Sequence, residues 1–183
     1  LEKLQAEKPR FNHRWTIEHF GLSTPEQVRR MADLGAIASV NVYYLHELSA
    51  IYAQDGIGTE RAHNMARLGT LRRNRILFAL HSDYTMAPAL PLNSAWVAAT
   101  RKNEKGDVVG PHEIVPLEDA LRAITIDAAY VLGLEHEVGT LRAGKRADFT
   151  VLEQDPFEVG AQGLKDIEIW GTVFGGAPHK IDK

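Results

Sequence analysis

The sequence predicts an α/β fold in which helices join the strands of a parallel sheet. Segments rich in β-forming or apolar residues occur at 13–19, 36–42 and 75–83, and segments with helical character lie between them. This repeated strand–helix–strand order favours a parallel sheet with helical crossovers. Three core strands are too few for an independent doubly wound domain of this length, but they suit the last part of an eight-stranded barrel.

The first eight residues have the pattern of an amphipathic helix. Leu1 and Leu4 lie on one face of it, and Pro9 ends the pattern. The segment contains neither an initiator Met nor a signal peptide. Because the chain opens inside a helix, we expect it to be a fragment, or a mature product cut from a longer protein.

The next elements can be placed from their boundary residues. Thr24 as N-cap and Pro25 at the first helical position begin a helix that Gly35 ends. Residues 36–42 are mostly apolar, as expected for a strand that is buried on both faces. Further helices are predicted at 43–53, 61–73, 93–102 and from about Leu117 to Leu132.

The character of the sequence changes after Gly133. Short β-prone segments, split by glycines and an Asp-Pro turn, follow at 138–141, 144–145, 147–152 and 167–174. We therefore divide the chain into residues 1–133, a partial barrel domain, and residues 134–183, part of a small β-domain.

Composition narrows the classes of partner. The formal net charge of -3 and the pI of about 6.3 give no reason to expect nucleic acid or an anionic membrane surface. No apolar run approaches the roughly 18–20 residues of a membrane span. The chain has no cysteine, which excludes disulfides and thiolate metal sites. We therefore expect neither a nucleic-acid nor a membrane partner.

Two residues at predicted strand ends could carry chemistry. His19 ends the first strand and Asp83 ends the third, and active sites of parallel α/β barrels lie at the carboxyl ends of strands. An imidazole nitrogen and a carboxylate oxygen are both good zinc ligands. The alternatives are that His19 is a packed or surface histidine and that Asp83 caps a turn.

The other histidines give weaker indications. His81 lies two positions before Asp83 and so shares a strand face with it, either as a pocket residue or as a core histidine. We interpret the histidines in helices, loops and the β-domain as solvated; these are His46, His63, His112, His136 and His179.

Several segments together resemble one enzyme family. HRWTIEH at 13–19 resembles a segment of the amidohydrolase superfamily, and specifically of its amidohydrolase-3 branch, which includes N-substituted formamide deformylases. LHSD at 80–83, followed by Pro88, resembles the Gly-Ser-Asp-x-Pro segment of that branch. PLEDAL at 116–121 and VGTLRAGKRADF at 138–149 resemble its helix after the barrel and the return into its β-sandwich.

The resemblance implies a fold and site residues. The chain would be about strands six to eight of a (β/α)8 TIM-type barrel plus part of a small β-sandwich. His19 matches the family's sixth-strand metal ligand, and Asp83 matches the eighth-strand aspartate that contacts metal and handles the proton of the attacking water. Arg101 matches an arginine often found there, and His81 stands where the family usually has Gly; both are possible pocket residues.

The resemblance also implies a function. It is hydrolysis of a C–N bond in an amide or cyclic amide by a metal-activated water, with zinc as the expected metal and Asp83 as the catalytic residue. The family's other metal ligands would precede Leu1, so we expect this chain alone to be inactive. The alternatives are a deaminase of the same superfamily and a non-catalytic half-barrel.

Partners and compartment follow from the same interpretation. We expect a small-molecule amide as substrate and a cytoplasmic location. An open half-barrel leaves sheet edges uncovered, so we also expect a homo-oligomer or association with the missing half.

Overall fold

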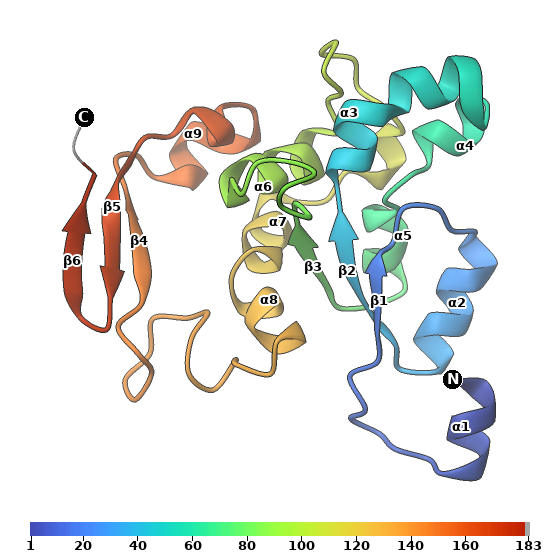
Figure 1. The fold of residues 1–183 in the computed structure, drawn as a ribbon, viewed down its shortest axis with the longest axis horizontal. Helices are drawn as coiled ribbons and strands as arrows, with labels where there is room; N and C mark the ends of the chain where they lie inside the picture. The colour runs from blue at the N-terminus through green and yellow to red at the C-terminus, as the bar shows by residue number, and fades with distance from the viewer. Residues whose placement is uncertain (182–183) are drawn as a thin grey trace.

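The computed structural model describes residues 1–181 and contains two separate three-stranded sheets (Figure 1). The first has the order β1-β2-β3 with both pairs parallel, and the second has the order β4-β5-β6 with both pairs antiparallel. The strands are β1 (Thr16–His19), β2 (Ile37–Asn41), β3 (Phe78–His81), β4 (Phe149–Leu152), β5 (Ile169–Phe174) and β6 (Ala177–Lys180). The predicted α/β class is confirmed.

Helices connect the parallel strands and follow them. They are α1 (Glu2–Glu7), α2 (Pro25–Asp33), α3 (Tyr43–Ile51), α4 (Thr59–His63), α5 (Leu68–Arg73), α6 (Pro91–Thr100), α7 (Leu117–Ala123), α8 (Ile126–Val131) and α9 (Pro156–Gly163). A π-helical segment, η1 (Tyr52–Gly56), and two 3₁₀ segments, η2 (Pro111–Glu113) and η3 (Leu164–Asp166), complete the elements. Within residues 1–181, no helix has the length and apolar character needed to cross a membrane.

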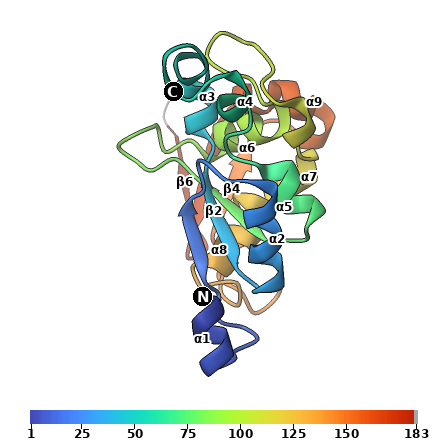
Figure 2. The same ribbon diagram turned by 90° about the vertical axis from the view of Figure 1, so that its right-hand side faces the viewer.

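The core lies between the parallel sheet and its helices. All five residues of β2 are buried because a strand lies on each side of it, and α2 and α5 lie on one side of the sheet (Figure 2). Val40 of β2 belongs to the same apolar cluster as Val28 of α2, Leu71 of α5 and Val97 of α6. β1 is an edge strand, and Ile17 within it is 43% exposed. That these three strands form part of a closed barrel remains a prediction.

The helix predicted after Thr24 begins as its sequence indicates. The Thr24 hydroxyl accepts a hydrogen bond from the Gln27 backbone N–H, and the Gln27 side chain accepts one from the Thr24 N–H. This reciprocal cap satisfies two donors that a helix start leaves free. Gly35, with a φ of 68°, follows its end.

Two predicted helices are each divided in the structure. The segment 61–73 is split into α4 and α5, because Ala66 has a φ of 47°, which no right-handed helix contains. The segment 117–132 is split into α7 and α8 at Thr125. There the hydroxyl donates to the Leu121 carbonyl at 2.8 Å, which competes with the helical backbone hydrogen bonds.

The C-terminal part contains fewer strands than predicted. β4 and β5 form, but 138–141 and 144–145 are turns, in which Lys145 Nζ donates to the carbonyls of Glu135 and Val138. The prediction also missed α9, although Asp155 caps it through a 2.7 Å hydrogen bond from the Phe157 N–H. The Asp-Pro pair is a helix start here rather than a strand-breaking turn.

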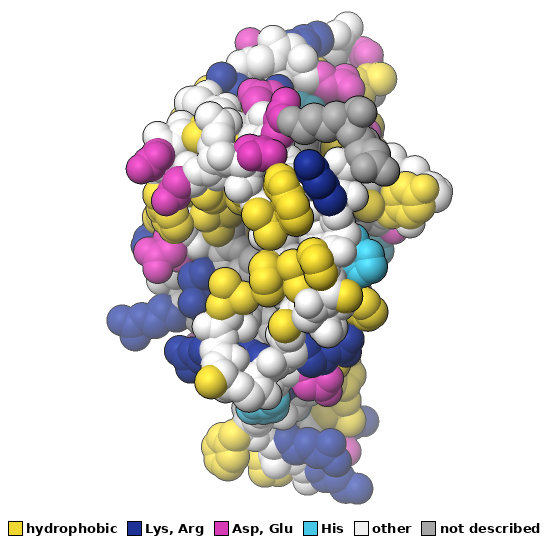
Figure 3. Space-filling view, turned by 90° about the vertical axis from the view of Figure 1, so that its left-hand side faces the viewer, with side chains coloured by type: hydrophobic (Ala, Val, Ile, Leu, Met, Phe, Trp, Pro, Cys, Tyr) yellow, Lys and Arg dark blue, Asp and Glu magenta, His cyan; other side chains and the backbone are white. Residues whose placement is uncertain are grey.

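The second sheet joins the rest of the molecule through α9 and η3. Leu164 and Ile167 belong to the main apolar cluster, and the Trp96 indole N–H of α6 donates to the Gln162 carbonyl at 3.2 Å. Apolar side chains gather on the face of the molecule that the second sheet forms (Figure 3), and Phe149 and Phe174 of this sheet are exposed. The domain boundary at 133/134 remains a prediction.

Candidate active site

The carboxyl ends of the three parallel strands lie at one edge of the sheet. His19 ends β1, Asn41 ends β2 and His81 ends β3, with Asn41 and His81 paired in register. Asp83 follows two residues after the end of β3. This is the edge at which parallel α/β folds place their functional side chains.

His19 and Asp83 meet at this edge. The distance from His19 Nε2 to Asp83 Oδ2 is 3.2 Å, and the side chains are 45% and 44% exposed. The prediction that the two residues lie together is confirmed, while their roles as ligands remain a prediction. Both residues have left-handed backbone conformations, with φ values of 64° and 51°. Such conformations are uncommon outside glycine and are often found at functional sites.

Two aromatic rings hold the His19 imidazole in place. The Tyr44 ring stacks on it with 6.2 Å between centroids, and the His81 ring meets it edge-on at 5.2 Å. Tyr44 comes from the first turn of α3, so this helix and β3 both contribute to the surroundings of His19. The ring therefore has neighbours on two sides, while its Nε2 faces Asp83.

His81 lies beside the pair and contacts both of its members. Its Nδ1 accepts a hydrogen bond from the Asp83 backbone N–H at 3.1 Å, and its Nε2 is enclosed and has no hydrogen-bond partner among residues 1–181. Burial lowers the pKa of His81 because it disfavours the charged ring, and the neighbouring His19 lowers this pKa further. The structure thus places His81 beside both sequence-predicted site residues.

Asn41 is a residue at this edge that the sequence motifs did not identify. It is fully buried, its Oδ1 accepts the Tyr43 N–H at 3.0 Å, and its Nδ2 lies 3.7 Å from the Met86 sulfur. It therefore connects the end of β2 with the loop that follows Asp83. The available signal was an amide side chain at the end of a strand whose other residues are small or apolar.

The donor chemistry of the pair fits a zinc ion, but the number of donors is small. A catalytic zinc usually takes three protein ligands and a water. Over residues 1–181, no group of three or more His, Cys, Asp and Glu side chains is arranged to hold a metal ion. His19 and Asp83 can therefore fill two positions of such a shell.

Arg101, predicted as a possible pocket residue, is buried within the fold. It is 1% exposed and lies at the left-handed C-cap of α6, with a φ of 57°. Its guanidinium donates to the carbonyls of His63, Met65, Ala66 and Val109 at 2.7–3.1 Å. Burial lowers the pKa of Arg101 to about 9.

The role of Arg101 is to hold the turn between α4 and α5. Ala66, whose carbonyl it binds, donates its own N–H to the Gly21 carbonyl at 3.0 Å. Gly21 lies two residues after His19, so Arg101 supports the loop behind the site without contacting the His19–Asp83 pair.

His46 is half-buried and packed against two aromatic rings, so the expectation of a solvated side chain is wrong in part. Its ring lies edge-on to Tyr43 and Trp96, at 6.1 and 5.6 Å between centroids, and its Nδ1 bonds to the Lys102 carbonyl at 2.8 Å. The helical position of His46 is correct, but α3 turns this face toward α6.

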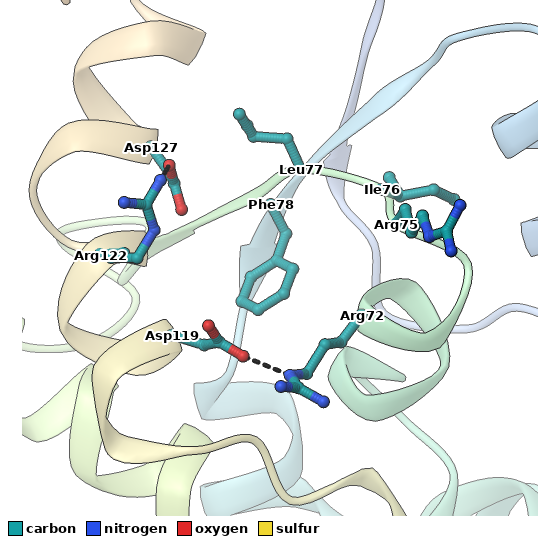
Figure 4. Close-up of a pocket in the computed structure, with 8 residues that line it drawn as sticks. All are labelled: Arg72, Arg75, Ile76, Leu77, Phe78, Asp119, Arg122 and Asp127. Carbon is teal, nitrogen blue, oxygen red and sulfur yellow. Dashed lines mark hydrogen bonds and ion pairs between the residues drawn. The ribbon is translucent and has the colours of Figure 1, made fainter.

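A cavity of about 260 Å³ lies at the opposite end of β3 (Figure 4). Leu77 and Phe78, at the amino end of the strand, line it together with side chains of α5, α7 and α8. Arg72 forms an ion pair with Asp119 here, and Arg122 forms one with Asp127. The cavity contains no predicted site residue, and four of its charged side chains form these two ion pairs, while Arg75 also lines it.

Comparison with known proteins relates the whole chain to one family. The sequence profile of the Amidohydrolase family matches residues 1–179. An N-substituted formamide deformylase from Arthrobacter pascens is 26% identical over 160 residues, which are 87% of this chain and 30% of that protein. Protein LONG AFTER FAR-RED 3 from Arabidopsis thaliana is 33% identical over 169 residues, 90% of this chain and 28% of that protein. The chain thus spans less than a third of the length of these relatives.

A deaminase and two solved structures are also similar. A 5-methylthioadenosine/S-adenosylhomocysteine deaminase from Moorella thermoacetica is 44% identical over 46 residues, 25% of this chain and 11% of that protein. An uncharacterised metal-dependent hydrolase from Pyrococcus horikoshii has a TM-score of 0.67 and 26% identity, over 81% of this chain and 30% of that one. Zinc-complexed atrazine chlorohydrolase TrzN from Arthrobacter aurescens has a TM-score of 0.63 at 19% identity, over 97% of this chain and 38% of that one, and shares the fold.

Proposed function

Because the chain belongs to the amidohydrolase family, we propose that it supplies part of the active site of a metal-dependent hydrolase. The bond cleaved is a C–N bond in a small amide or cyclic amide. The observation that carries this proposal is the 3.2 Å approach of His19 Nε2 to Asp83 Oδ2 at the carboxyl edge of the parallel sheet. Residues 1–181 bring no third such ligand to this pair.

The two residues would hold a divalent metal, with zinc the ion best suited to a nitrogen and an oxygen ligand. When bound, such a metal supplies polarisation of the substrate carbonyl and a lower pKa for the attacking water. The zinc in the structure of TrzN, which shares this fold, supports the choice.

Asp83 is the residue that would move the proton. Its carboxylate is 44% exposed and can accept a proton from the attacking water. The same oxygen can then deliver the proton to the nitrogen that leaves as the C–N bond breaks. His19, held between Tyr44 and His81, would keep the metal and the carboxylate in a constant relation.

Deamination of an aminated heterocycle is the second candidate. The similarity to the deaminase from Moorella thermoacetica favours deamination, because the two sequences are 44% identical over a stretch of 46 residues. The chemistry asked of Asp83 is the same, since a water attacks a carbon and an amine nitrogen leaves. A panel of N-acyl compounds and aminated heterocycles separates the two candidates by product.

Zinc binding by purified residues 1–183 tests the proposal. We expect weak binding in calorimetry, because residues 1–181 offer only His19 and Asp83 as ligands at this site, and we expect little turnover of N-acyl substrates. Changing His19→Ala or Asp83→Ala should abolish that binding, whereas the exposed His136→Ala is the matched control. Zinc affinity that is unchanged in both site variants would overturn the assignment.

A further inference from the structure

The backbone of Asp83 has a conformation that requires support. Its φ of 51° places it in the left-handed region, which costs a non-glycine residue free energy even though Asp tolerates it better than most. The residue is exposed, so packing around its side chain does not enforce this conformation. The Asp83 carbonyl accepts a hydrogen bond from the Met86 N–H at 2.6 Å, and an interaction at the Asp83 N–H would add to this support.

The His81 side chain provides that interaction. The Asp83 N–H donates to His81 Nδ1 at 3.1 Å, across two residues. A backbone N–H can only donate, so Nδ1 is the unprotonated nitrogen and the neutral ring carries its proton on Nε2. The hydrogen bond fixes the start of the loop after β3 and thereby the direction in which the Asp83 side chain leaves the backbone.

The same ring also contacts the other half of the pair. Its edge meets the His19 ring with 5.2 Å between centroids and 83° between planes. His81 thus contacts Asp83 through a hydrogen bond and His19 through its ring, while the two partners lie 3.2 Å apart. One side chain constrains both members of the site.

We propose that His81 is a positioning residue that holds the Asp83 carboxylate against His19. What the pair does chemically rests on the proposed function, but the positioning itself does not. His81 acts through its neighbours, because its Nε2 is enclosed and finds no hydrogen-bond partner in the described part of the chain, so no ligand reaches this atom without movement of the ring. His19 and Asp83, in contrast, are 45% and 44% exposed.

Two substitutions of similar shape distinguish the roles of the two ring nitrogens of His81. The side-chain oxygen of His81→Asn can occupy the place of Nδ1 and accept the Asp83 N–H. The amide of His81→Gln reaches instead toward the place of Nε2, and His81→Ala removes both groups. The exposed His136→Ala, in the segment after α8, controls for the loss of an unrelated histidine.

The first measurement is hydrogen exchange of the Asp83 amide by NMR. We expect exchange to be about 5- to 10-fold faster in His81→Ala and His81→Gln, the factor that corresponds to one ordinary hydrogen bond. Exchange in His81→Asn should stay near the wild-type rate. The amide of buried Val40 in β2 should keep its protection in all variants, which shows that the sheet is intact. Equal exchange of the Asp83 amide in all His81 variants would overturn the proposal.

Zinc affinity is the second readout. Loss of a group that orients a ligand typically weakens metal binding by ~10–100-fold, so His81→Ala and His81→Gln should bind zinc more weakly than His81→Asn. If His81→Gln retained affinity and His81→Asn lost it, the Nε2 atom would be the important one and the positioning role would be wrong. If wild-type protein bound no zinc, the proposed function would fail, while amide exchange would still decide the positioning.

Discussion

The Arg14 guanidinium donates two hydrogen bonds to the carboxylate of Glu135, which lies 121 residues further along the chain. The same group lies 4.1 Å from the centre of the Tyr130 ring, and the Tyr130 hydroxyl donates to Asn12 at 2.9 Å. This cluster ties the segment before β1 to the segment after α8. It therefore joins two segments that are far apart in the sequence.

The Arg14–Glu135 pair makes the free energy of unfolding depend on pH. The hydrogen bond from Arg14 is the main reason that the pKa of Glu135 falls to about 2 from its usual 4.5. A carboxyl with a lowered folded-state pKa stabilises the fold above its unfolded pKa, and this stability is lost as pH falls through the folded pKa. Between about pH 4.5 and pH 2, wild-type protein should therefore lose more stability than Glu135→Gln. Urea unfolding at several pH values measures the free energy of unfolding of both proteins. The same dependence on pH in wild-type protein and in Glu135→Gln would contradict the prediction.

Replacement of Arg101 should destabilise the whole fold. Arg101→Met would leave three buried carbonyl groups and one half-buried carbonyl without their donor, and Arg101→Lys would replace only part of the planar donor set. Each unsatisfied buried group costs about 1–3 kcal/mol, so we expect a loss of about 3–5 kcal/mol for Arg101→Met and less for Arg101→Lys. Chemical denaturation checks the values, with Arg29→Met at an exposed position of α2 as the control. A loss below about 1 kcal/mol would mean that water replaces the guanidinium.

Local sequence predicted the parts of the fold whose causes are local. The small and apolar run at 36–42 predicted β2, and the Thr24 cap predicted the start of α2, because burial and capping act within a few residues. The approach of His19 and Asp83 also followed, since parallel strands bring their carboxyl ends to one edge. The same reasoning could not find Asn41, because one polar residue at a strand end is no motif.

The predictions that were wrong failed because contacts between residues far apart in the sequence determine the structure at those positions. The break at Ala66 interrupts a good helical pattern, and the group that binds its carbonyl is Arg101, 35 residues later. Arg101 itself was misjudged because its acceptors are backbone carbonyls, which no side-chain pattern reveals. His46 lies on the face of α3 that contacts Trp96 of α6. The sequence of α3 alone does not predict which of its faces packs against another helix. Long-range polar contacts were thus the least predictable part of the structure.

The edge of the parallel sheet at β1 should cause self-association of this chain. Ile17 is 43% exposed and Trp15 is 47% exposed, and β1 pairs with a neighbour on only one side. An exposed apolar edge strand offers unpaired backbone groups to another chain, and a lysine on such a strand opposes pairing. We therefore expect concentration-dependent oligomers in sedimentation velocity, and a shift toward monomer in Ile17→Lys. Phe174→Lys on the second sheet is the matched control, because Phe174 is also exposed but lies away from β1. If Phe174→Lys alone produced monomer, the second sheet would be the interface and the role given to β1 would be wrong.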